Sequence, residues 1–533
     1  MKFRSPVHDQ PARDSSAGGH ESSAEPSAQR VRSPWREADR VLPTWSDPVA
    51  RAASTLVGGP WGRHGLVGRQ WFWTPLRVCL GLALLVLTLA WLFKSPCRDG
   101  AWTASKQYTH MCYSDVVPLF FTEHLNIGAV PYRDHAVEYP VLTGGFMYVA
   151  AVLSRAYDGV AGGLLPTVNP VESYFDATAL LLACCALVMV WAVTRLTGRR
   201  VWDAAMVALS PVLVVHAFTN WDLFAVALAT LALVAWQTRR PLLAGVLVGL
   251  GTAAKLYPVL FLVPLALLCW RTRRWRELGL TAAGAVGSWL LVNLPVALAY
   301  PDSWLRFFTL NETRPADPDS LWNVLRFATG RPLDDALADG AAPVVLNTAV
   351  FLAFAAALAG VAVLTLTARR QPRLSQLLFL VVAAFLLTNK VWSPQYSLWL
   401  VPLAVLARPS WRAYLAWQAT EALLWFPRMY WYLGTANKGV DEQWFLLAVL
   451  VRDAAVLVYC ALVVRDILSP DQDVVRSAGS AGSADDPAGG VLADRTTEVP
   501  DEPDDSDNPD QSAARPAARS GAVVPGEPSG SDG

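Results

Sequence analysis

The most regular feature of the chain is a series of apolar segments separated by short polar turns, between about residues 76 and 464. Segments of roughly 17–25 apolar residues can span a membrane as helices, and shorter ones can cross where a bundle protects them. This pattern predicts an all-α membrane protein with about 12 transmembrane helices, at 76–93, 174–196, 202–219, 221–236, 242–254, 258–270, 278–299, 344–368, 374–388, 394–407, 411–426 and 444–464.

A thirteenth apolar segment, Pro140 to Tyr157, decides the predicted topology. If it does not cross and the N-terminus is inside, the arginine clusters of every short loop fall on the cytoplasmic side, as the positive-inside rule requires. If it crosses, all of these clusters move outside. We therefore expect a re-entrant or interfacial helix here, with both termini in the cytoplasm and the protein in the plasma membrane.

Composition agrees with this class and separates the ends from the middle. Hydrophobic residues make up 53% of the chain and 23 residues are tryptophan, which excludes an ordinary soluble domain. The sequence predicts three regions: a disordered cytoplasmic segment at 1–70, a transmembrane domain at 76–466 and a disordered acidic cytoplasmic tail at 469–533. From residue 471 onward, 14 acidic residues stand against four arginines, although the whole chain is neutral. A solvated tail is the expected state, and no nucleic acid partner is expected.

One lysine lies inside an apolar run, "GTAAKLYPVLFLVPL", in a chain with only six lysines. A charge at the centre of a bilayer costs about 2.5–3.5 kcal/mol on insertion scales, so such a residue usually faces protein, water or a ligand. The predicted topology places "KLYP" in a tight outer turn between two short helices. Lys255 is therefore expected at the outer rim of the membrane.

Most of the polar residues embedded in apolar sequence fall on the same outer face. Carboxylates and amides hydrogen-bond hydroxyl groups, aromatic rings cover the apolar side of a sugar, and lysines supply charge for phosphate. The pattern therefore predicts a site for a sugar and a phosphate at the membrane surface. Its candidate residues lie in "YSDVVPLFF" (Asp115), "VPYRDHAVEYPVLTG" (Asp134, Glu138), "FTNWDLF" (Asp222), "KLYP" (Lys255, Tyr257) and "TNKVWSPQYSLW" (Lys390, Gln395, Tyr396).

These motifs together resemble a known family. An acidic first outer loop, a "YP" turn leading into an embedded helix, the later "KLYP" and an "NWD" turn are similar to glycosyltransferase family 87 of the GT-C superfold. That family includes polyprenyl-phosphate-mannose-dependent mannosyltransferases of actinobacterial envelopes. The resemblance covers roughly Leu76 to Val464. The chain departs from the family where "YPP" is replaced by Tyr139-Pro140-Val141, and Asp115 lies unusually far beyond the first span.

The resemblance implies a transferase that moves a hexose from a polyprenyl-phosphate donor to an envelope lipid or glycan acceptor, with inversion. One first-loop carboxylate would be the general base: Asp115 by its position, with Asp134 and Glu138 as rivals. Lys255 would anchor the donor phosphate, with Lys390 as a second candidate. The remaining expected donor contacts are Tyr257, Asp222, Gln395 and Tyr396. The outer segments show no His/Asp/Glu group at ligand spacing, so neither a metal site nor another cofactor is expected.

Two structural pairs are also predicted. Cys97 and Cys112 lie in the first outer loop, where an oxidising exterior permits a disulfide. Glu421, Arg452 and Asp453 are the deepest charges, and we expect an ion pair between the last two antiparallel helices.

Two other functions fit the same topology. A transporter or lipid flippase would show internal repeats and polar residues at the midplane. A non-catalytic envelope scaffold would use its tails as binding sites.

Overall fold

The computed structural model describes residues 72–161, 166–331, 333–334, 341–477 and 486–493. The predicted segment 1–70 lies outside these residues. Within them the regular elements are all helices, and the strand-like pairing is a single isolated bridge between Pro131 and His135.

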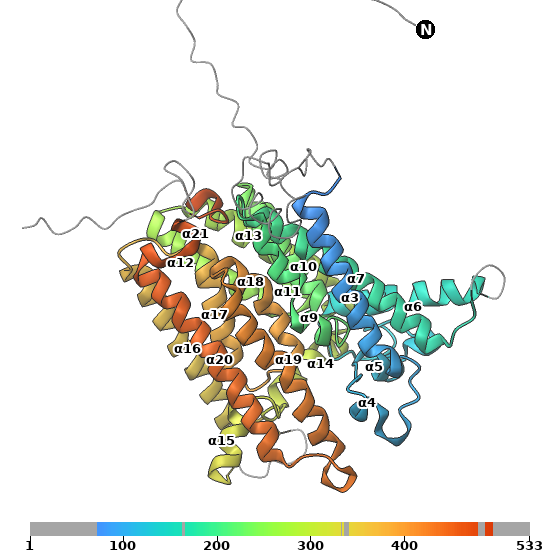
Figure 1. Cartoon of the computed structure of the whole chain (residues 1–533). Coiled ribbons are helices and arrows are strands. Elements are labelled where there is room, and N and C mark those ends of the chain that lie inside the picture. The colour runs from blue at the N-terminus through green and yellow to red at the C-terminus, as the bar shows by residue number, and fades with distance from the viewer. Residues whose placement is uncertain (1–71, 162–165, 332, 335–340, 478–485, 494–533) are drawn as a thin grey trace, which may run out of the picture.

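The helices follow one another with short connections (Figure 1). In chain order the α-helices are α3 (Pro75–Lys94), α4 (Lys106–Thr109), α5 (Val116–Thr122), α6 (Val141–Val160), α7 (Pro170–Leu196), α8 (Ala204–Ala208), α9 (Pro211–His216), α10 (Asp222–Gln237), α11 (Pro241–Ala254), α12 (Leu262–Thr272), α13 (Trp275–Ala299), α14 (Pro301–Thr313), α15 (Leu321–Thr329), α16 (Val344–Thr367), α17 (Leu374–Thr388), α18 (Ser397–Ala407), α19 (Trp411–Leu433), α20 (Glu442–Leu468) and α21 (Val474–Ser477). The 3₁₀ helices are η1 (Ser95–Cys97), η2 (Thr103–Ser105), η3 (Leu125–Ile127), η4 (Val201–Asp203), η5 (Tyr257–Phe261), η6 (Pro394–Tyr396), η7 (Thr435–Asn437), η8 (Pro470–Gln472) and η9 (Gly490–Leu492).

Five helical segments of the described residues are long and apolar enough to span a membrane: Pro75–Cys97, Pro170–Leu196, Trp275–Ala299, Val344–Thr367 and Glu442–Leu468. Shorter apolar helices lie between them: Asp222–Gln237, Pro241–Ala254, Tyr257–Thr272, Leu374–Thr388 and Pro394–Ala407. This is the architecture of a helical membrane protein.

The prediction of one continuous helix over 202–219 is wrong. The chain forms α8 and α9 there, and Ser210 between them has an extended backbone. Proline disfavours the α conformation of the residue before it, so Pro211 ends one helix and begins the next. The helix predicted at 411–426 instead continues through Pro427 to Leu433.

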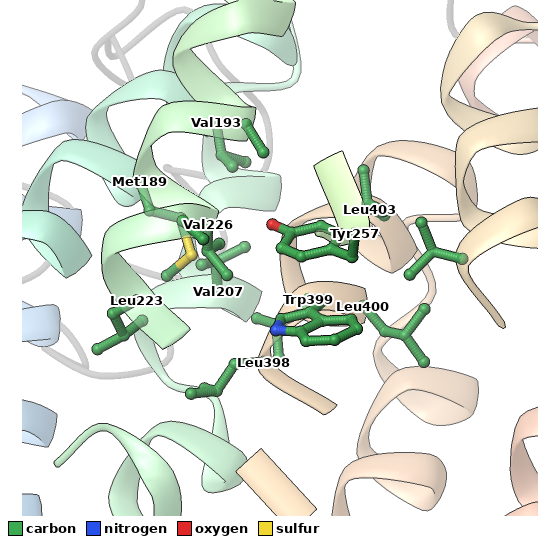
Figure 2. Close-up of a cluster of buried hydrophobic side chains, with 14 of the residues drawn as sticks. Met189, Val193, Val207, Leu223, Val226, Tyr257, Leu398, Trp399, Leu400 and Leu403 are labelled. Carbon is green, nitrogen blue, oxygen red and sulfur yellow. The ribbon is translucent and has the colours of Figure 1, made fainter. Parts of the chain in front are cut away.

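The central core joins helices that are distant in sequence (Figure 2). Met189 and Val193 of α7 and Leu223 and Val226 of α10 face the apolar side chains of α18. The ring of Tyr257, at the start of η5, stacks on Trp399 of α18 with centroids 4.3 Å apart and planes 8° apart. Tyr257 lies two residues after Lys255 in the chain, so this stack fixes the "KLYP" turn to the core.

Helices α11 and α13 run side by side in the same direction at very close range. A Cβ atom added at Gly245 would lie 2.0 Å from the carbonyl oxygen of Thr281. One added at Gly249 would lie 2.1 Å from the Ser288 hydroxyl and 2.2 Å from the Ala285 carbonyl oxygen. Two glycines four residues apart allow the backbones to touch, as in other membrane helix pairs.

We expect Gly249→Ala to destabilise the protein by about 1–3 kcal/mol, because the new methyl group must push the α13 backbone away. Thermal unfolding in detergent measures this loss. Gly287→Ala is the matched control, because a Cβ atom there meets no atom within 4 Å. Equal melting temperatures for the two variants would contradict the close packing of α11 on α13.

Part of the C-terminal region folds back onto the bundle. Arg373, just before α17, forms a fully buried ion pair with Asp473 at 2.7 Å. Trp236 donates its indole N–H to the carbonyl of Gly489 at 2.9 Å, and the Asp486 carboxylate accepts the Leu374 N–H at 2.9 Å. Residues 470–477 and 486–493 are therefore ordered, contrary to the prediction of disorder from 469 onward. The rest of that segment lies outside the described residues.

Candidate active site

A cavity of about 520 Å³ lies where several helix ends and turns converge. This volume is within the range of small-molecule sites. Its walls come from the segment before α5, the turn after α9, the α11–η5 turn, the connection after α14, the α17–α18 connection and α19. Six of the nine residues predicted for catalysis and donor binding line it: Asp115, Glu138, Lys255, Tyr257, Gln395 and Tyr396.

Asp115 is fixed on the cavity wall by the turn that follows α9. Its backbone N–H donates to the carbonyl of Thr219 at 2.8 Å, and its Oδ2 accepts a hydrogen bond from the Asn220 amide at 2.7 Å. The Tyr113 side chain lies beside the same carboxylate and also lines the cavity. Within the described part of the chain Asp115 forms no ion pair within 4 Å. An oriented carboxylate that faces a cavity is the geometry that a general base requires.

Lys255 reaches the cavity from the end of α11. Its Nζ lies 3.3 Å from both carboxylate oxygens of Asp222, which is fully buried at the start of α10. Asp222 also accepts the Trp399 indole N–H at 2.7 Å. The ammonium group lies 4.9 Å from the ring centroid of Tyr396. Asp222 does not line the cavity itself but holds the charge of Lys255 at its wall.

Two predicted residues lie elsewhere. Asp134 forms a hydrogen-bonded ion pair with Arg133 at 2.8 Å and accepts the Val130 N–H, which closes an exposed turn. These hydrogen bonds hold the pKa of its carboxyl below the usual range. Lys390 donates to the carbonyls of Glu312 and Arg314 and to the side chain of Asn347, at 2.6–3.0 Å. Because an ammonium group has three donors, Lys390 is fully used in holding the end of α14.

The cavity also contains charged and aromatic residues that were not predicted. Arg314 pairs with Asp317 at 3.2 Å, yet 42% of its side chain remains exposed. Arg428 donates to Asp319 at 2.8 Å, and its guanidinium lies 4.9 Å from the ring centroid of Tyr432. Arg428 and Tyr432 were missed because they belong to the part of α19 beyond Pro427. The "ETRPADPD" loop, with its alternating charges, was the sequence signal for Arg314.

A second carboxylate, Glu138, faces the cavity from a loop held by a buried pair. The Glu123 carboxylate lies beside the backbone of Glu138, and its Oε2 lies 2.9 Å from Nε2 of His135. Burial raises the pKa of Glu123 to about 7 and also raises the pKa of Glu138. The Glu123–His135 pair therefore fixes the backbone just before Tyr139 and Pro140.

This pair predicts a pH-dependent stability. The pKa of Glu123 rises from 4.5 to about 7 on folding, so its protonation favours the folded state below about pH 4.5, and this contribution is lost as the pH rises through 7. Between pH 5 and 8, the wild type should therefore lose melting temperature relative to Glu123→Gln. Asp134→Asn, in the same loop, should show no such difference. A constant difference between wild type and Glu123→Gln would contradict this assignment.

The loop that carries Asp115 is tied to the first long helix. Cys97 and Cys112 form a disulfide, with Cα atoms 5.6 Å apart. The bond joins the end of η1, which directly follows α3, to the residue before Tyr113, and so limits the movement of the segment before Asp115.

The deep charges pair differently from the expectation. Arg452 pairs with Asp453 of its own helix at 2.6 Å, and its guanidinium lies 3.6 Å from the ring centroid of Trp392. Glu421 accepts hydrogen bonds from Ser397 and Trp417 at 2.7 and 2.9 Å. The prediction of an ion pair between α19 and α20 is therefore wrong, because neutral donors satisfy Glu421.

The described residues contain no group of three or more His, Cys, Asp or Glu side chains placed to hold a metal ion.

The model of glycosyltransferase family 87 matches residues 144–389, from the first turn of α6 to the end of α17. Asn220, Asp222, Lys255 and Arg314 fall inside this range, whereas Asp115 and Glu138 precede it. No curated protein matches the chain. The resemblance seen in the sequence motifs is thus confirmed.

Proposed function

We propose that this chain is a membrane glycosyltransferase of family 87, whose model matches residues 144–389, and that it moves a hexose, mannose, from a polyprenyl-phosphate donor to a glycolipid or glycan acceptor of the cell envelope. The observation that carries the proposal is the presence of Asp115 and Lys255 on the walls of one cavity. A carboxylate that can take a proton and a cation that can meet a leaving phosphate are what a sugar transfer from a lipid phosphate requires.

The reaction follows from these two groups. Asp115 removes the proton of an acceptor hydroxyl while the hydroxyl oxygen attacks the anomeric carbon of the donor. The bond from that carbon to the phosphate oxygen breaks, and its electron pair leaves with the polyprenyl phosphate. Lys255 and the half-exposed Arg314 stabilise the negative charge on the leaving group. Attack opposite the leaving group inverts the anomeric configuration.

The other cavity residues suit the sugar. Gln395 can exchange hydrogen bonds with hydroxyl groups, and Tyr396 offers a ring and a hydroxyl beside Lys255. Glu138 lies on the same wall region as Asp115 and would orient the acceptor or the sugar.

The proposal includes a GT-C-like bundle of about 12 transmembrane helices with the cavity on the extracytoplasmic side and both termini in the cytoplasm. Its support is that the cavity residues and the C-terminal contacts lie at opposite ends of the helix bundle. Asp115, Lys255 and Tyr396 lie at one end, and the Arg373–Asp473 ion pair lies at the other. α6 is not one of the helices that are long and apolar enough to span a membrane. In Figure 1 it extends to the side of the bundle. An interfacial position for α6 fits both observations.

The test is a transfer assay with the purified protein in proteoliposomes. Polyprenyl-phosphate donors carrying mannose, glucose or galactose are each supplied with envelope glycolipid acceptors, and products are identified by mass spectrometry. We expect a new glycosidic bond from the mannose donor. Movement of the lipid-linked sugar across the bilayer without any new glycosidic bond would instead support a flippase.

A further inference from the structure

A buried lysine behind the cavity has no role in the reaction described so far. Lys94, the last residue of α3, is fully buried and does not line the cavity. Its Nζ donates one hydrogen bond, to the carbonyl of Tyr113 at 2.7 Å, and lies 4.5 Å from the ring centroid of Trp425. A buried ammonium group is costly unless a negative charge compensates it.

Asp115 is the carboxylate that attracts the charge of Lys94, while Arg428 acts as an opposing like charge. Lys94 forms no ion pair within 4 Å among the described residues, so its attraction to Asp115 acts over a longer distance. Tyr113, whose carbonyl accepts the Lys94 hydrogen bond, also has its side chain beside the Asp115 carboxylate.

The segment from Met111 to Asp115 is held from both sides. On one side, the indole N–H of Trp425 donates to the carbonyl of Met111 at 2.7 Å, and Lys94 donates to that of Tyr113. On the other side, Ser114 donates its hydroxyl to the carbonyl of Phe218 at 2.7 Å. Lys94 is the member of this set that brings a charge as well as a hydrogen bond.

We propose that Lys94 is a positioning residue for Asp115: its ammonium group holds the Tyr113 backbone in place, two residues before Asp115, and attracts the Asp115 carboxylate from behind the cavity wall. The proposal rests on the proposed function in one respect, because Asp115 is the general base only if the chain transfers a sugar. The electrostatic coupling between the two side chains does not depend on that function.

The coupling is measured by a stability cycle that needs no activity. Lys94→Gln keeps a donor for the Tyr113 carbonyl but removes the charge. In the wild-type background this change should lower the melting temperature, because Asp115 loses its compensating charge. In an Asp115→Asn background it should have no effect or raise the melting temperature, since the lysine there is a buried charge without its anion.

Two further variants complete the cycle. Lys106→Gln, in the same loop and paired with Asp99 at 3.2 Å, is the matched control and should lower the melting temperature equally in both backgrounds. Lys94→Met serves as a second neutral variant if Lys94→Gln does not fold. Equal effects of the Lys94 substitution in the two backgrounds would overturn the proposal.

The kinetic test separates positioning from general stability. Lys94→Gln should lower kcat about 10-fold or more with little change in the KM for the donor, and should add no further loss to Asp115→Asn. Lys106→Gln should transfer sugar at the wild-type rate. A loss confined to the KM, or a loss that adds to that of Asp115→Asn, would overturn the role of Lys94. If the wild type transfers no sugar, the proposed function fails while the stability cycle still decides the coupling.

Discussion

Asp115→Asn is expected to reduce the turnover of sugar transfer by about 10²–10⁴-fold, the usual contribution of a placed general base. The amide keeps the shape of the carboxylate and can still accept the Asn220 hydrogen bond, so the cavity wall is preserved. It cannot take the proton of the acceptor hydroxyl. The KM for the donor should therefore change little, because the lost interaction belongs to the transition state.

The measurement is kcat and KM for the mannose donor in proteoliposomes. Asp134→Asn is the matched control: it lies in the same long loop, but its carboxylate closes a turn outside the cavity. It should transfer sugar at the wild-type rate. Wild-type turnover by Asp115→Asn would move the base to Glu138, the other first-loop carboxylate on the cavity wall.

The sequence predicted the site residues best where the local pattern of polar and apolar residues alone marks a residue as unusual. Asp115, Lys255 and Tyr396 were chosen because polar residues interrupt apolar segments at helix ends, and the fold brings these ends together around one cavity. The family motifs strengthened this choice, since "NWD" supplies both Asn220, which holds Asp115, and Asp222, which holds Lys255.

The sequence failed where a role depends on distant partners. Nothing near Lys390 shows that its three donors go to the end of α14 and to Asn347, so it was indistinguishable from a phosphate ligand. Arg428 was missed for a local reason: a proline usually ends a helix, yet α19 continues through Pro427 and carries Arg428 to the cavity. The order of residues 486–493 depends on hydrogen bonds to Trp236 and Leu374, far away in sequence.

Lys255→Met is expected to have two separable effects, because Lys255 is bound to a buried carboxylate as well as facing the cavity. Removing the ammonium group leaves Asp222 fully buried with the Trp399 indole N–H as its one remaining side-chain donor among the described residues, which should destabilise the protein by roughly 3–5 kcal/mol. It also removes a cation that would meet the leaving phosphate, so transfer should fall by about 10²-fold or more.

The double variant Lys255→Met/Asp222→Asn separates these effects. An asparagine can still accept the Trp399 hydrogen bond and carries no charge, so the melting temperature should recover most of the loss. Transfer should not recover, since the cavity still lacks its cation. Recovery of both properties would mean that Lys255 serves only to neutralise Asp222, and the phosphate would then have to be held by Arg314, the half-exposed cation of the same cavity.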